Sequence, residues 1–170
     1  MTIRILLADD ENLIRTALAQ LLSLEDDLDV VAHADNGADA VRLAVREAVD
    51  VAVLDLQMPE LDGITVAQRL GTQLPGCGTV IVTSHGRPGH LKRALSSGVR
   101  GFLPKTTSAA TLAQVVRSVH GGGRFVDPEL AVKASLSPGT VRNYLSNAMA
   151  KLGAANRHDA CAIARRLGWI

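Results

Sequence analysis

The run Val51-Ala52-Val53-Leu54-Asp55-Leu56-Gln57-Met58-Pro59 carries more information than any other part of this chain. Its unbroken apolar residues predict a strand that is buried on both faces, as in a parallel sheet. Pro59 and Gly63 then interrupt the chain. We therefore expect this strand to deliver the carboxylate of Asp55 to its carboxyl end, where open parallel sheets build their sites.

A second apolar run, Ile3–Ala8, ends in the acidic pair Asp9-Asp10. Like charges that are held close together raise one another's pKa and favour unfolding. A hard cation would offset that repulsion, and ligands that are all oxygen atoms suit Mg²⁺. The sequence therefore predicts a magnesium site that includes Asp9, Asp10 and Asp55.

Strand and helix patterns alternate along the first 120 residues. The predicted strands are Ile3–Ala8, Leu28–Ala34, Val51–Leu56, Thr79–Thr83 and Gly101–Leu103. Between and after them, apolar residues recur at helical spacing; the clearest examples are Ile14, Ala17, Leu18, Leu21 and Leu22, and Leu112, Val115, Val116 and Val119. This rhythm predicts an α/β fold with five parallel strands and helices on both faces of the sheet.

Four predicted strands end in residues that bear functional groups, in the order Asp9-Asp10, Asp55, Thr83 and Lys105. With this ordered set, residues 1–120 resemble the receiver domain of two-component response regulators. The resemblance implies a flavodoxin-like, doubly wound sheet with the strand order 2-1-3-4-5. It also implies that Asp55 is the phosphoacceptor, whose carboxylate attacks a phosphohistidine of a sensor histidine kinase.

The resemblance assigns a metal and its ligands. Mg²⁺ would be held by Asp9, Asp10, Asp55 and the backbone carbonyl of Gln57. Asp10 would bind the ion more directly than Asp9, which would act partly through water. The ion would neutralise the phosphoryl oxygens, since phosphoryl transfer depends mostly on positioning and charge stabilisation. Solvated carboxylates at loop starts are the alternative interpretation.

The resemblance also assigns the residues that respond to phosphorylation. Lys105 would pair with Asp55 at rest and with phosphoryl oxygens afterwards. Thr83 would hydrogen-bond a phosphoryl oxygen through its hydroxyl group. Phe102, three residues before the lysine, lies where the family has a switch aromatic, and simple core packing is the competing interpretation for it.

The C-terminal part resembles a second family. Ser137, Pro138 and the residues that follow open a helix whose sequence is similar to the recognition helix of LuxR-type (NarL/FixJ-type) helix-turn-helix domains. The resemblance implies promoter DNA as a partner. Arg142, Asn143 and Ser146 would reach base edges, and Thr140 and Lys151 would contact phosphates. An ordinary solvated helix face is the alternative.

Charge divides the chain in the same way. Residues 1–128 hold 12 Lys and Arg against 15 Asp and Glu, whereas residues 129–170 hold 6 against 2. An acidic front joined to a basic tail suggests a polyanion as the tail's partner.

We predict a receiver at 1–120, a linker at 121–128 that begins at three glycines, and a partial helix-turn-helix domain at 129–170. The family's first helix, and the turn after it, have no counterpart in that tail, which we therefore expect to be a shortened all-α domain.

The combined interpretation is a response regulator that is phosphorylated on Asp55, forms a homodimer and regulates transcription, rather than a conventional enzyme. Segments such as Arg87-Pro88-Gly89 look most like the desaturase-regulating members of this family. No apolar run approaches the roughly 18 residues of a membrane span, and the N-terminus lacks a signal-peptide pattern, so we expect no membrane partner and a cytoplasmic location.

The alternative function is a phosphorylation-dependent dimerisation or interaction module with a non-functional tail. A flavin- or nucleotide-binding enzyme is disfavoured, because Asp9-Asp10-Glu11 after the first strand would repel a phosphate.

Overall fold

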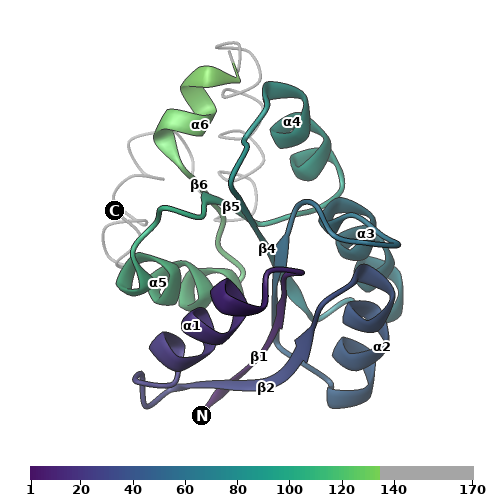
Figure 1. The fold of residues 1–170 in the computed structure, drawn as a ribbon, viewed down its shortest axis with the longest axis vertical. Helices are drawn as coiled ribbons and strands as arrows, with labels where there is room; N and C mark the ends of the chain where they lie inside the picture. Colours follow the sequence, from purple (N-terminus) through teal and green to yellow (C-terminus); the bar gives the residue numbers. More distant parts are fainter. Residues whose placement is uncertain (135–170) are drawn as a thin grey trace, which may run out of the picture. The chain divides into compact units, whose positions relative to one another are not determined.

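In residues 1–134, which are the part that the computed structural model describes, six strands form one parallel sheet (Figure 1). Their order across the sheet is β2-β1-β3-β4-β5-β6. The strands are β1 (Ile3–Ala8), β2 (Leu28–Ala34), β3 (Val51–Asp55), β4 (Gly78–Thr83), β5 (Gly101–Pro104) and β6 (Phe125–Val126). The order of the first five strands is the one that the receiver resemblance predicted.

Helices cover both faces of this sheet. They are α1 (Asn12–Leu22), α2 (Gly37–Glu47), α3 (Gly63–Gln73), α4 (Pro88–Ser96), α5 (Ala109–His120) and α6 (Pro128–Lys133). Helices α1 and α5 lie together on one face, and α2, α3 and α4 lie on the other (Figure 1). The predicted α/β, doubly wound fold class is therefore confirmed. Each helix between residues 1 and 134 is too short or too polar to cross a bilayer.

The predicted strands match the observed ones closely. Ile3–Ala8 and Leu28–Ala34 have the bounds that we predicted, and the other three differ by one residue at one end. Every residue of β3 and β4 is buried, as expected for central strands covered on both faces. Continuous apolar runs that stop at acidic, glycine or proline residues mark the ends of such strands clearly.

The core beneath α1 and α5 is built from aliphatic side chains of the central strands and of α5, among them Ile5, Val53, Val80 and Val116. The predicted apolar stripe of α5 is buried there throughout. The stripe of α1 is only partly covered, because Leu22 is its one fully buried residue and Leu21 remains 45% exposed. Helix α1 therefore keeps apolar surface outside the core of the described unit.

The segment 121–128, which we predicted to be a linker, contains strand β6. The amide of Phe125 donates to the carbonyl of Arg100 at 2.8 Å, and the amide of Asp127 donates to the carbonyl of Phe102 at 3.0 Å. These bonds satisfy the outer edge of β5, which would otherwise present unpaired backbone groups. The sheet therefore has six strands rather than five, and the compact unit extends to Ala134 rather than to residue 120.

Helix α6 packs against α4. Asp127 caps it by accepting hydrogen bonds from the amides of Glu129 and Leu130 at 3.0 and 3.1 Å. Leu130 is 8% exposed and lies against Gly86, where an added Cβ would overlap its side chain. The predicted DNA-contacting residues, Thr140, Arg142, Asn143, Ser146 and Lys151, lie outside the described residues.

Candidate phosphoacceptor site

Three carboxylates meet at the carboxyl ends of β1 and β3. One ligand oxygen from each of Asp9, Asp10 and Asp55 lies within 4.8 Å of the other two. Asp9 and Asp55 are buried, whereas Asp10 is exposed. The structure thus brings together the three acidic residues that the sequence predicted to share a site.

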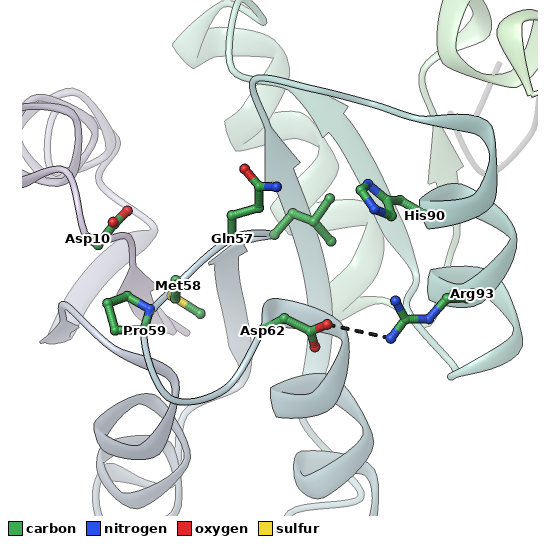
Figure 2. A pocket seen from close by; sticks show the side chains of 8 residues that line it. Asp10, Gln57, Met58, Pro59, Asp62, His90 and Arg93 are labelled. Atoms are coloured by element: carbon green, nitrogen blue, oxygen red, sulfur yellow. Dashed lines mark hydrogen bonds and ion pairs between the residues drawn. The ribbon is translucent and has the colours of Figure 1, made fainter.

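The loop after β3 forms a pocket of about 470 Å³ beside this cluster (Figure 2). Its lining residues are Asp10, Leu56, Gln57, Met58, Pro59, Asp62, His90 and Arg93. Arg93 of α4 reaches across to Asp62, with 3.5 Å between Nη2 and Oδ2 (Figure 2). The pocket is therefore bounded by the β3–α3 loop on one side and by α4 on the other.

A close backbone approach fixes the position of Asp55. Gly63 begins α3, and a Cβ at this residue would overlap the carbonyl oxygen of Asp55. The amide of Gly63 donates to the carbonyl of Leu56 at 3.0 Å. Asp62 caps the helix by accepting a hydrogen bond from the amide of Thr65 at 2.7 Å. Glycine is thus required where α3 starts directly against the end of β3.

Lys105, after β5, inserts its ammonium group among the carboxylates. Its Nζ lies 2.8 Å from Oδ2 of Asp9, 2.9 Å from Oε1 of Glu11 and 3.5 Å from Oδ2 of Asp55. The predicted pairing with Asp55 is present, but it is the longest of the three. Desolvation opposes the charged form, yet hydrogen bonds to Asp9 and Glu11 outweigh it and raise the pKa of Lys105 above its ordinary value.

The Asp55 carboxylate is destabilised by its surroundings. Burial is the largest cause and raises the pKa of Asp55 to about 6; attraction to Lys105 opposes the shift, and repulsion from Asp9 adds to it. The cluster therefore holds more negative charge than one lysine balances. Oxygen-only ligands with an excess of negative charge are what a hard divalent cation requires, so these residues fit Mg²⁺.

Thr83 and Phe102 take different positions relative to this cluster. Thr83 ends β4, is 3% exposed, and accepts a hydrogen bond from the amide of His85 through Oγ1 at 3.1 Å. Phe102 is fully buried in β5. This placement accords with core packing, and the proposed switch role of Phe102 remains a prediction.

Sequence reasoning missed three residues near the site: Glu11, His90 and Arg93. Glu11 carried a usable signal, because a third acidic residue directly after Asp9-Asp10 must start at the same edge of the sheet. His90 and Arg93 carried none. Their place beside the pocket depends on how the β4–α4 loop sets the start of α4, and local sequence does not specify that.

Comparisons with known proteins assign the family. The model of the response regulator receiver domain matches residues 5–117, and that of the luxR family of bacterial regulatory proteins matches residues 128–164. The chain therefore belongs to the response regulators that join a receiver domain to a LuxR-type segment. The second match begins at the residue that starts α6.

Relatives span the whole chain. The transcriptional regulatory protein DesR of Bacillus subtilis (strain 168) is 33% identical over 199 aligned positions, which cover 99% of each chain. UhpA of Escherichia coli (strain K12) is 32% identical, over 98% of this chain and 100% of its own. These alignments span 199 and 202 positions, whereas this chain has 170 residues, so part of each relative has no counterpart in it.

A solved structure shares the fold. It is a LuxR-family two-component response regulator from Aurantimonas sp. SI85-9A1, with a TM-score of 0.74 and 27% identity. The match covers 79% of this chain and 96% of that one. The homologues are transcriptional regulators rather than conventional enzymes, which agrees with the class predicted from the sequence.

Proposed function

We propose that this chain is a response regulator that accepts a phosphoryl group on Asp55 from a sensor histidine kinase and thereby controls transcription. The observation that carries the proposal is the cluster at the carboxyl edge of the sheet. A buried carboxylate there lies within 3.5 Å of the Lys105 ammonium and beside the carboxylates of Asp9 and Asp10. Family membership supports the regulatory role.

In the proposed reaction, a carboxylate oxygen of Asp55 attacks phosphorus and the P–N bond of the phosphohistidine breaks. The imidazole leaves with the bonding electron pair, and no oxidant or reductant is needed. Lys105 supplies positive charge to the phosphoryl oxygens, and the Thr83 hydroxyl donates a hydrogen bond to one of them. Asp9, Asp10, Asp55 and the Gln57 carbonyl would hold Mg²⁺, which neutralises phosphoryl charge when bound.

Replacing Asp55 by asparagine tests the assignment directly. Asp55→Asn keeps the shape of the side chain but removes the nucleophile, so incorporation of label from radioactive acetyl phosphate should be lost. Asp35→Asn is the matched control, since it removes an exposed carboxylate that follows β2. Labelling of Asp55→Asn at the parent's rate would refute the proposed phosphoacceptor.

We further propose that the segment after α6 binds promoter DNA through the predicted residues. Arg142→Ala should cost about 1–3 kcal/mol of binding free energy and relax the preferred base, whereas Lys151→Ala should weaken binding to all sequences alike. Both effects are measurable by fluorescence anisotropy at several salt concentrations, because phosphate contacts make binding salt-dependent. If the phosphorylated chain binds no promoter fragment at low salt, the interaction-module alternative replaces DNA binding.

Homodimerisation on phosphorylation is also a proposal. Helix α1 supports it, because Leu13 is 82% exposed and Leu21 is 45% exposed on a helix whose apolar stripe is only partly buried. Sedimentation should show a rise in mass when the chain is saturated with beryllofluoride, a phosphoryl mimic. Leu13→Ser should reduce that rise, and an unchanged mass in the parent would contradict the proposal.

A further inference from the structure

Glu11 connects two elements of the phosphoacceptor site. Its side chain is 56% exposed, yet Oε1 accepts a hydrogen bond from Nζ of Lys105 at 2.9 Å. Its backbone amide donates to Oδ1 of Asp9 at the same distance. One residue at the start of α1 therefore contacts both a proposed metal ligand and the lysine that follows β5.

The three carboxylate partners of Lys105 have different fates in the proposed reaction. Asp9 and Asp55 are assigned to Mg²⁺, and Asp55 also becomes the phosphorylated residue. Glu11 is the partner that neither the metal nor the phosphoryl group takes. Because an ammonium group has three N–H donors, Lys105 can keep its bond to Glu11 while the other two donors change partners.

We propose that Glu11 is a positioning residue that holds Lys105 beside the carboxylates of the site before and after phosphorylation. The proposal rests on the proposed phosphorylation of Asp55. In the resting protein, Glu11 and Asp9 keep the ammonium closer to themselves than to Asp55, so the nucleophilic oxygen is not tightly paired. The negative charge of Glu11 also offsets that of the ammonium, which would otherwise repel a divalent cation entering the cluster.

A charge-only substitution tests this role. Glu11→Gln keeps the backbone amide that donates to Asp9 and nearly all of the side-chain shape, and it removes only the negative charge. Calorimetric titration should give Mg²⁺ binding that is weaker by about three- to tenfold, the scale of one screened charge near a divalent ion. Phosphorylation by acetyl phosphate at saturating Mg²⁺ should also slow several-fold, because Lys105 is then drawn toward Asp55.

Glu60→Gln is the matched control. It removes an exposed carboxylate from the β3–α3 loop, which borders the same pocket, and Glu60 makes no ion pair with Lys105. Its Mg²⁺ affinity and its phosphorylation rate should each stay within about twofold of the parent's, as expected for a distant, screened charge. An equal loss in both variants would show a general field effect and would overturn the specific role of Glu11.

A double-mutant cycle separates action through Lys105 from direct action on the metal. In a Lys105→Met background, Glu11→Gln should weaken Mg²⁺ binding no more than Glu60→Gln does. A full three- to tenfold loss in that background would overturn the proposal, as would parent-like behaviour of Glu11→Gln alone. If the parent itself is not labelled on Asp55, the proposed function fails instead, so the two failures are distinguishable.

Discussion

Two ion-pair clusters join distant parts of the described chain, and their surroundings differ. The first, called the Lys105 cluster, consists of Lys105, Asp9, Glu11 and Asp55. The second, called the Arg117 cluster, consists of Arg117, Glu25 and Asp27. The first links the loops after β1 and β5 to the end of β3, whereas the second links α5 to the turn between α1 and β2.

Burial separates the two clusters. The Lys105 side chain is 9% exposed and that of Arg117 is 36% exposed. Burial raises the pKa of Asp55 to about 6, whereas the hydrogen bond from Arg117 lowers the pKa of Asp27 below its ordinary value. One cluster therefore holds a carboxylate that is poorly stabilised as an anion, and the other holds one that is well stabilised. The pKa shifts of the two clusters therefore have opposite signs, as expected if Asp55 belongs to the proposed phosphorylation site and Asp27 to an exposed ion pair.

Removing the buried cation should have the largest effect on stability. Lys105→Met keeps most of the aliphatic stem but leaves Asp9 and Asp55 buried without their ammonium partner. We expect the free energy of unfolding at pH 8 to fall by roughly 4 kcal/mol, the scale for breaking a buried ion pair. Urea denaturation without Mg²⁺ measures it, with Lys92→Met on the exposed side of α4 as control. A loss no larger than that of the control would contradict the buried character of the Lys105 cluster.

Removing the poorly stabilised anion should have the opposite sign. The native pKa of Asp55 is about 6, above its ordinary 3.8, so the folded state binds the proton more tightly. Ionisation therefore costs native stability as pH rises from about 4 through 6. Asp55→Asn should raise the free energy of unfolding at pH 8 by up to about 3 kcal/mol. The gain should disappear near pH 4, where the parent is also neutral; a gain that is independent of pH would exclude this cause.

The two acidic residues after β1 should differ in metal binding. Both oxygens of Asp9 already accept hydrogen bonds, from Lys105 at 2.8 Å and from the Glu11 amide at 2.9 Å, whereas Asp10 is exposed and lines the pocket. Asp10→Asn should therefore weaken Mg²⁺ binding more than Asp9→Asn, by about tenfold or 1.4 kcal/mol. Calorimetry without phosphodonor gives the two affinities. Equal values for both variants and the parent would remove the metal assignment.

The sequence predicted the Lys105 cluster better than it predicted its surroundings. Parallel strands place their carboxyl ends at one edge, so Asp9 and Asp55 could be grouped from the strand pattern, and the receiver resemblance added Lys105. The bond from Lys105 to Glu11 could not be predicted, because it depends on the reach of two side chains across loops.

Strand β6 and the Arg117 cluster were missed for a related reason. A two-residue strand has no periodicity to detect, and it exists because it pairs with the edge of β5. The residues of the Arg117 cluster lie about 90 positions apart in the chain, with Arg117 next to a buried stripe. Sequence patterns specify elements and faces, whereas pairings between distant side chains follow from the assembled fold.

The Arg117 cluster should show the smallest and the most salt-sensitive effect. Exposed pairs contribute little and are screened, so Arg117→Ala should lower Tm by less than half as much as Lys105→Met, and less still at high salt. Arg42→Ala is the control, since it breaks an exposed pair with Asp39 within one helix turn.

The pH dependence of Arg117→Ala gives the sharper contrast with Asp55→Asn. Because the pKa of Asp27 is lowered in the folded state, its pairing stabilises the protein above the ordinary pKa of 3.8 and is lost as pH falls through the lower native value. The parent and Arg117→Ala should therefore converge in Tm at strongly acidic pH, below the range in which the effect of Asp55→Asn changes. Mg²⁺ should leave this difference unchanged, since the metal is expected only at the Lys105 cluster. A difference that Mg²⁺ abolished would mean that the two clusters are coupled, and Arg117 would then belong to the proposed phosphorylation site rather than to a separate ion-pair cluster.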